Sequence, residues 1–255
     1  MDYKRLSFIG GGRIVRILLK AFQNASLHFD AINVYEKDEQ TFMRLRSEYP
    51  QVEATSLADA FRQDLVILAL HPPVLVQLLS ELEESCHTDA TIVSLAPKVT
   101  TTQIGSCLKT DKVVRMIPSA TSLIGKGYNP VAFHPSFDKT GKDSILALFE
   151  PTGHVFETME NKLGGYVITS AMLPTYFWYQ LQELQQIAMQ TALDGDESKQ
   201  AIHQTLTAAI ELFFEADMSA DEVIDLIPAK PMGEAEPLLR KFYQEKLLSL
   251  YEKIK

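Results

Sequence analysis

Cysteine and tryptophan are scarce in this chain. Its 255 residues include two cysteines, Cys86 and Cys107, and one tryptophan. Two cysteines are too few for a disulfide framework, which favours a protein that folds in a reducing compartment. The sequence also lacks a signal-peptide segment and any apolar run of about 18 residues. On these grounds we expect a soluble, cytoplasmic protein.

Positive charge is also in short supply. Lys and Arg number 24 against 33 Asp and Glu, for a formal net charge of -9. Nucleic acids and anionic membranes bind clustered cations, so neither is expected as a main partner. The histidines, at 28, 71, 87, 134, 154 and 203, include no pair spaced i, i+3 or i, i+4, and the adjacent Cys86 and His87 cannot comfortably chelate one metal alone. We therefore predict no metal site.

Apolar residues are plentiful, at 46% of the chain. Over residues 1–162, short β-branched runs alternate with segments of helical period, a pattern typical of a parallel sheet with helices on both faces. The expected strands are 6–9, 31–35, 65–70, 91–95 and 113–117, with helices at 14–22 and 74–82 and added edge strands at 131–134 and 154–157.

From residue 163 the strand pattern stops and amphipathic helices follow. Phe177, Leu181 and Leu184 share one apolar face, and Ser219 to Glu222 form a capping-box signature. We predict an α/β fold, with a Rossmann-like doubly wound parallel sheet in residues 1–162 and an all-helical domain in residues 163–255. Helices this apolar in a small domain need a partner surface, so we expect a homodimer through the C-terminal helices.

Three consecutive glycines, Gly10 to Gly12, follow the first expected strand and precede the first expected helix. In this context Gly10 permits a tight turn, and Gly12 lets the backbone approach a pyrophosphate at the helix start. The third small position of this dinucleotide-binding fingerprint is Val15 here. Arg13 either contacts a phosphate or is solvated. A strand-to-helix turn that binds nothing is the alternative interpretation.

The second expected strand is followed by Glu36 and Lys37. A carboxylate at this place accepts the ribose 2′-hydroxyl of NAD, whereas a cation accommodates the 2′-phosphate of NADP. Glu36 would repel a phosphate and Lys37 would attract one. The pair favours NADH as the cofactor without excluding NADPH. The alternative interpretation is that both residues are solvated charges at a strand end and bind nothing.

Five stretches, among them the one that contains the glycine turn, resemble segments of a known family. "FIGGGRIV", "VILALHPP", "VSLAPKVT" and "VRMIPSATSLIGKG" occur in the order and spacing of the pyrroline-5-carboxylate reductases, and "YVITSAMLPTYFWYQLQELQQIA" resembles the start of that family's helical half. The resemblance covers essentially the whole chain, and the "VRMIPSATSLIGKG" segment is its most specific part. It implies a Rossmann domain, a helical domain that interlocks into a dimer, and hydride transfer from NAD(P)H to the C=N carbon of a cyclic imino acid.

The resemblance also implies site residues. The cofactor would meet Gly10, Gly12, Arg13 and Ile14 at the pyrophosphate, Glu36 and Lys37 at the adenosine ribose, Ala69, His71 and Pro72 along its length, and Ala96 and Pro97 near the nicotinamide. The substrate candidates are Ser119, Ser170, Met172, Lys230, Gly233 and Glu234. His71 and Ser170 are the candidate catalytic residues.

The chain departs from the family at several of these positions. His71 replaces a lysine, and either contacts the cofactor or is a structural histidine. Ser170 to Pro174 replace a Ser-Gly-Ser-Gly-Pro turn. Ala229 to Glu234 replace a substrate-binding loop of the family and lack both of its threonines. The substrate is therefore left open between pyrroline-5-carboxylate and a related imine. The alternatives are a catalytically decayed dinucleotide-binding homodimer and a β-hydroxyacid-type dehydrogenase that would use Lys162 or Lys230.

Overall fold

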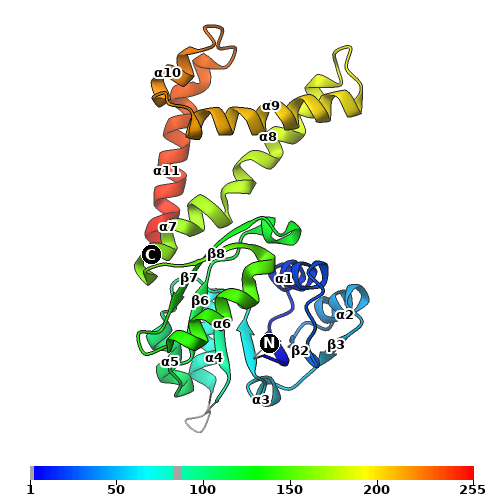
Figure 1. Ribbon diagram of the computed structural model, residues 1–255, viewed down its shortest axis with the longest axis vertical. Coiled ribbons are helices and arrows are strands. Elements are labelled where there is room, and N and C mark those ends of the chain that lie inside the picture. Colours follow the sequence, from blue (N-terminus) through cyan, green and yellow to red (C-terminus); the bar gives the residue numbers. More distant parts are fainter. Residues whose placement is uncertain (1–2, 83–87) are drawn as a thin grey trace. The chain divides into compact units, whose positions relative to one another are not determined.

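The computed structural model describes residues 3–82 and 88–255, so Cys86 and His87 lie outside the described residues. Contacts divide the chain into two compact units (Figure 1). The first comprises Met1–Met172 and Leu250–Lys255, and the second comprises Leu173–Ser249. Residues 163–172 belong to the first unit, where Leu163 and Val167 pack with Ile117 in a small apolar cluster.

The first unit contains an eight-stranded sheet with strand order β3-β2-β1-β4-β5-β6-β7-β8. The strands are β1 Arg5–Ile9, β2 Ala31–Tyr35, β3 Val52–Ala54, β4 Leu65–Leu68, β5 Thr91–Ser94, β6 Val113–Met116, β7 Gly127–Phe133 and β8 Gly153–Glu157. Neighbouring strands run parallel except β6 and β7, which are antiparallel. The predicted strands are confirmed with one correction: β7 is no edge strand, because β8 extends the sheet beyond it.

Helices cover both faces of this sheet, as the sequence predicts. They are α1 Arg13–Asn24, α2 Glu39–Glu48, α3 Leu57–Ala60, α4 Pro72–Glu81, α5 Thr101–Leu108, α6 Lys139–Phe149 and α7 Leu163–Tyr166. Successive side chains of a strand point to opposite faces. On β4, Leu65 and Ile67 accordingly join the apolar cluster under α1, α2 and α6, whereas Val66 and Leu68 join the one under α4 and α5.

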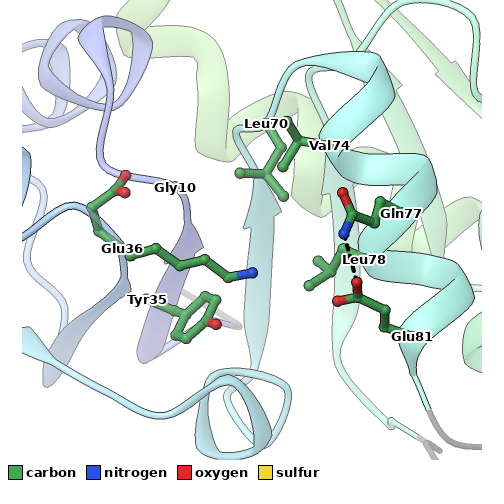
Figure 2. Close-up of a pocket in the computed structure, with 9 residues that line it drawn as sticks. Gly10, Tyr35, Glu36, Leu70, Val74, Gln77, Leu78 and Glu81 are labelled. Carbon is green, nitrogen blue, oxygen red and sulfur yellow. Dashed lines mark hydrogen bonds between the residues drawn. The ribbon is translucent and has the colours of Figure 1, made fainter.

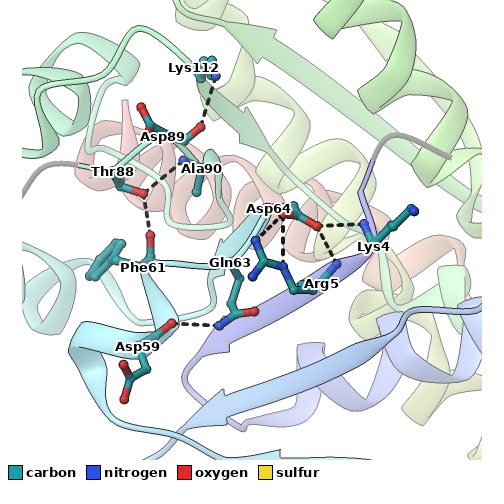
Figure 3. Close-up of polar contacts among 10 residues, drawn as sticks. All are labelled: Lys4, Arg5, Asp59, Phe61, Gln63, Asp64, Thr88, Asp89, Ala90 and Lys112. Atoms are coloured by element: carbon teal, nitrogen blue, oxygen red, sulfur yellow. Dashed lines mark hydrogen bonds and ion pairs between the residues drawn. The ribbon is translucent and has the colours of Figure 1, made fainter.

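Asp64 ties the beginning of β4 to the beginning of β1 (Figure 3). One oxygen of its carboxylate accepts hydrogen bonds from the backbone N–H groups of Lys4, at 3.1 Å, and Arg5, at 2.8 Å. The other oxygen lies 2.8 Å from Nη2 of the Arg5 guanidinium. The guanidinium hydrogen bond, followed by those of the backbone, holds the pKa of Asp64 below its usual value.

This lowered pKa predicts how acid affects stability. Asp64 stabilises the fold fully above its usual pKa of about 3.9, and the contribution is lost as pH falls through the lower folded-state value. We expect Asp64→Asn to lower the free energy of unfolding at pH 7, with a deficit that shrinks toward about pH 2. Urea unfolding at a series of pH values measures it. Asp89→Asn removes the same charge at an exposed position, and its free energy of unfolding should vary with pH as that of the wild type does. A deficit that is constant with pH would contradict the prediction.

The second unit is helical. It contains α8 Leu173–Ala188, α9 Gly195–Glu215, α10 Ala220–Asp225 and α11 Glu236–Ile254 as far as Ser249. The predicted capping box is confirmed, because the Ser219 hydroxyl accepts from the Glu222 N–H and the Glu222 carboxylate accepts from the Ser219 N–H. No helix in residues 3–82 and 88–255 is long and apolar enough to cross a membrane.

The helices of the second unit bury very little. Throughout residues 173–249, Ser198 is the one buried residue. The predicted apolar face of α8 is open, with Phe177 46% and Leu184 45% exposed, and on α9 Phe214 is 76% exposed. Aqueous exposure of so many large apolar side chains is unfavourable and marks an interaction surface.

Candidate functional site

The glycine turn joins β1 to α1 at the point where the order of the sheet switches. From β1 the chain first builds β2 and β3 on one side, then returns to build β4 and β5 on the other. Ligands of doubly wound sheets bind at the carboxyl ends of the strands at such a switch point. The turn, and the loop after β4, therefore lie where this fold places a ligand.

The two outer glycines of the turn have different physical roles. Gly10 has a φ of +100°, and a Cβ there would lie 2.7 Å from the backbone oxygen of Ala69. Gly12 is the residue before α1, and a Cβ there would have no heavy atom within 4 Å. Glycine is thus required at position 10 by the fold itself, whereas position 12 opens onto free space at the start of a helix. Val15 is fully buried in the core.

A cavity of 640 Å³ adjoins this turn. Its walls come from the loops after β1, β4, β5 and β6 and from residues 167–172. The lining residues are Gly12, Arg13, Ile14, Ala69, Leu70, His71, Pro72, Leu95, Pro97, Ile117, Pro118, Val167, Ala171 and Met172. The cavity thus brings together seven of the predicted cofactor residues and one predicted substrate residue, Met172. The charged or titratable side chains of its lining, Arg13 and His71, belong to the loops after β1 and β4.

A smaller cavity of 150 Å³ lies on the β2 side of the turn (Figure 2). Gly10, Tyr35, Glu36 and Lys37 form one wall, and Leu70, Val74, Gln77, Leu78 and Glu81 form the other. Oε2 of Glu36 accepts a hydrogen bond from the Gly11 N–H at 2.7 Å, and Oε1 accepts one from the Asp38 N–H at 2.9 Å. On the opposite wall, Gln77 donates to Glu81 at 2.7 Å.

Comparison with known proteins agrees with this architecture. The family model described as "NADP oxidoreductase coenzyme F420-dependent" matches residues 5–98. The pyrroline-5-carboxylate reductase of Haemophilus influenzae is 19% identical over 217 residues, which cover 84% of this chain and 80% of the relative. That of Methanosarcina acetivorans is 23% identical over 243 residues, covering 91% and 87%.

Solved structures show the same fold along the whole chain. The 1-pyrroline-5-carboxylate reductase of Streptococcus pyogenes superposes with a TM-score of 0.80 at 17% identity, covering 100% of this chain and 99% of the other. The Plasmodium falciparum pyrroline carboxylate reductase, solved with NADP bound, gives 0.76 at 15% identity, covering 100% and 96%. Along most of its length the chain is therefore similar in sequence to pyrroline-5-carboxylate reductases, and it shares their fold.

The segment Ser170 to Pro174 begins within a stretch of unusual backbone that starts three residues earlier, at Val167. Val167–Ala171 form one turn of π-helix, a feature common at functional sites. Ser170 donates its hydroxyl to the carbonyl of Tyr128 at 2.6 Å and does not line the large cavity. Met172 lines the cavity, and its N–H donates to Val167 at 2.9 Å. This segment therefore presents apolar side chains to the cavity and satisfies its polar groups internally.

Ser119, one of the predicted substrate residues, is held inside the protein. It is 3% exposed; its N–H donates to Oδ1 of Asn129 at 2.8 Å, and its hydroxyl lies 2.9 Å from that of Thr121. Asn129 in turn donates to Thr152 at 2.9 Å. Ile117 and Pro118, rather than Ser119, line the cavity. Ser119 and Asn129 thus fix the loop that carries these two residues.

The remaining predicted residues fall in three places. Ala96 is 1% exposed, while its neighbours Leu95 and Pro97 line the large cavity. His71 is exposed and stands directly before α4. Lys230, Gly233 and Glu234 belong to the second unit, where the Gly233 N–H donates to the Lys230 carbonyl at 2.9 Å and both charged side chains are exposed.

Several lining residues were not anticipated. Gln77 and Glu81 complete the small cavity from α4, and their i, i+4 spacing was the available signal. The role of Asn129 could be suspected from its position, since an amide inside an apolar strand needs hydrogen-bond partners. Ile117 and Val167 carry no local signal, because an apolar residue that lines a cavity looks in sequence like one that fills the core.

Proposed function

We propose that this protein is an NAD(P)H-dependent reductase that transfers a hydride to the C=N carbon of a cyclic imino acid or a related small imine. The observation that carries the proposal is the pair of cavities on either side of the Gly10–Gly12 turn, with Glu36 in one and Met172 in the other. The named relatives reduce or bind compounds of this class according to their names. The open space at Gly12 fits the cofactor, because the absence of a Cβ lets a pyrophosphate approach the backbone at the start of α1.

The chain's own groups have mainly binding and positioning roles in this reaction. The N–H groups at the start of α1, together with Arg13, would bind the pyrophosphate. Reduced nicotinamide, when bound, supplies the hydride. Ile117, Pro118 and Met172 would exclude water around the reacting carbon, which is already electrophilic in an iminium and needs positioning more than activation. With its hydroxyl bonded to Tyr128, Ser170 supports the wall, and His71 remains the candidate proton donor.

We further propose that residues 163–255 form a homodimerisation and substrate region, with residues 1–162 binding the dinucleotide. The exposed apolar faces of α8 and α9 support this, because a second copy would remove them from water. Sedimentation equilibrium of the full chain tests the assembly. A monomer at micromolar concentration would contradict it. A cytoplasmic location stays a prediction from the cysteine content.

The reductase is tested by following oxidation of NADH and NADPH with two substrates, pyrroline-5-carboxylate and 1-pyrroline, which lacks the carboxylate. Turnover of either imine supports the proposal. Saturable dinucleotide binding without turnover of either would instead support the second candidate, a dinucleotide-binding homodimer without catalysis. That candidate is favoured by two observations: the Ser170 hydroxyl is bonded to the Tyr128 carbonyl, and the apolar Met172 lines the large cavity. Failure to bind either dinucleotide would contradict both.

A further inference from the structure

The small cavity contains a feature that bears on which dinucleotide the protein selects. We propose that Glu36 makes the protein bind NADH in preference to NADPH, an inference that rests on the proposed function. Glu36 follows β2 directly and lines the cavity beside Gly10. The fold places the adenosine ribose of a dinucleotide at the end of this strand. The chemistry available there decides between a ribose hydroxyl and a ribose phosphate.

The carboxylate of Glu36 is fixed from two sides. Oε2 accepts from the Gly11 N–H at 2.7 Å, and Oε1 accepts from the Asp38 N–H at 2.9 Å. Moving the side chain away would leave both N–H groups without this acceptor, which disfavours the alternative positions. Each carboxylate oxygen accepts more than one hydrogen bond. The group can therefore receive ribose hydroxyls while it keeps its two backbone partners, and it does not need to reorganise.

The charge of the cavity works against a phosphate. Its charged lining residues, within the part of the chain that the structure describes, are Glu36, Lys37 and Glu81. A 2′-phosphate would bring nearly two further negative charges beside a carboxylate that its backbone partners hold in place. Lys37 is exposed, so water screens its attraction for a phosphate, whereas Glu36 is partly buried and the repulsion is screened less. A ribose hydroxyl would instead donate a charge-assisted hydrogen bond to the carboxylate.

This preference differs from what the names of similar proteins suggest. The matching family model is described as an NADP oxidoreductase, and one similar structure was solved with NADP bound. The preference for NADH thus depends on this chain's own residues: an acidic side chain after β2 and two backbone N–H groups that hold it. The preference for NADH follows from the residues of the small cavity alone, so it does not depend on which imine the protein reduces.

Isothermal titration of the full-length protein with NADH, NADPH, ADP-ribose and 2′-phospho-ADP-ribose tests the inference independently of turnover. We expect NADH to bind at least about tenfold more tightly than NADPH, and the two fragments to show the same order. Glu36→Gln removes the charge and nearly keeps the shape. It should weaken NADH binding and strengthen NADPH binding, so that the ratio of the two dissociation constants approaches or passes unity.

Two further variants keep the test decisive. Glu39→Gln removes the same charge from an exposed residue in the first turn of α2 that does not line the cavity, and should leave the ratio unchanged. Glu36→Asp keeps the charge with a shorter reach. It should weaken the binding of NADH while still disfavouring NADPH, so the inference remains testable if Glu36→Gln does not fold.

Equal or tighter binding of NADPH by the wild type overturns the inference and leaves the proposed reductase function standing. An equal shift in Glu39→Gln overturns the role of Glu36. Binding of neither dinucleotide overturns the proposed function as well.

Discussion

Replacing Gly10 by alanine is expected to lower the free energy of unfolding by about 3 kcal/mol and to abolish dinucleotide binding. Gly10 has a φ of +100°, and its Cβ would stand 2.7 Å from the backbone oxygen of Ala69. Residues with a side chain rarely adopt this backbone conformation. The new Cβ would also overlap with a backbone oxygen, which cannot rotate away as a side chain could. Relief would require β1 and the loop after β4 to separate, which opens the turn between the two cavities. Urea unfolding and calorimetric titration with NADH measure the two effects.

Gly12→Ala is the matched variant, since it makes the same chemical change in the same turn. A Cβ at Gly12 meets no heavy atom within 4 Å, and its φ of −73° is ordinary. We expect its stability to stay within about 0.5 kcal/mol of wild type and its affinity for NADH to fall at least about tenfold, because the methyl group would occupy the approach of the pyrophosphate. Unchanged binding by Gly12→Ala would contradict the pyrophosphate assignment, and wild-type stability of Gly10→Ala would contradict the strain argument.

Local patterns predicted the elements that carry long apolar runs. The five main strands and the glycine turn were found because β-branched runs and glycines have strong local preferences. β3 was missed, since it has three residues and only Val52 of them is buried. The prediction of β7 as an edge strand was wrong. The sequence shows that this segment is a strand, but it does not show that β8 will pair with the edge that β6 leaves open.

The chemistry of the site was less accessible from sequence. The pattern located Glu36 at the end of β2, but its bonds to the Gly11 and Asp38 N–H groups depend on how two loops meet. The same limit applies to Ser170: the sequence shows a hydroxyl at a predicted site position, and the structure shows that this hydroxyl donates a hydrogen bond to the Tyr128 carbonyl. A hydroxyl has several possible partners, and tertiary contacts select among them.

Glu160→Ala is expected to lower the free energy of unfolding by about 3 kcal/mol or more, as for other buried charges that lose their partner. Arg115 on β6 is 5% exposed, and its Nη1 donates to Oε1 of Glu160 at 3.0 Å. The same oxygen accepts from the Thr101 N–H at 2.7 Å. Among the residues that the structure describes, none accepts a hydrogen bond from Arg115 Nε. Loss of Glu160 would therefore leave a buried cation whose remaining contacts cannot balance its charge. Urea unfolding monitored by circular dichroism measures the loss.

A more exposed ion pair, between β8 and α6, provides the control. Glu157 lies 2.6 Å from Lys142, but the two side chains are 48% and 27% exposed. Glu157→Ala should therefore cost at most about 1 kcal/mol. The double variant Arg115→Met with Glu160→Gln removes the buried charge while keeping an acceptor for the Thr101 N–H, and should recover most of the stability lost in Glu160→Ala. If the double variant is as unstable as Glu160→Ala, the loss comes from packing around Glu160 and not from the unpaired charge of Arg115.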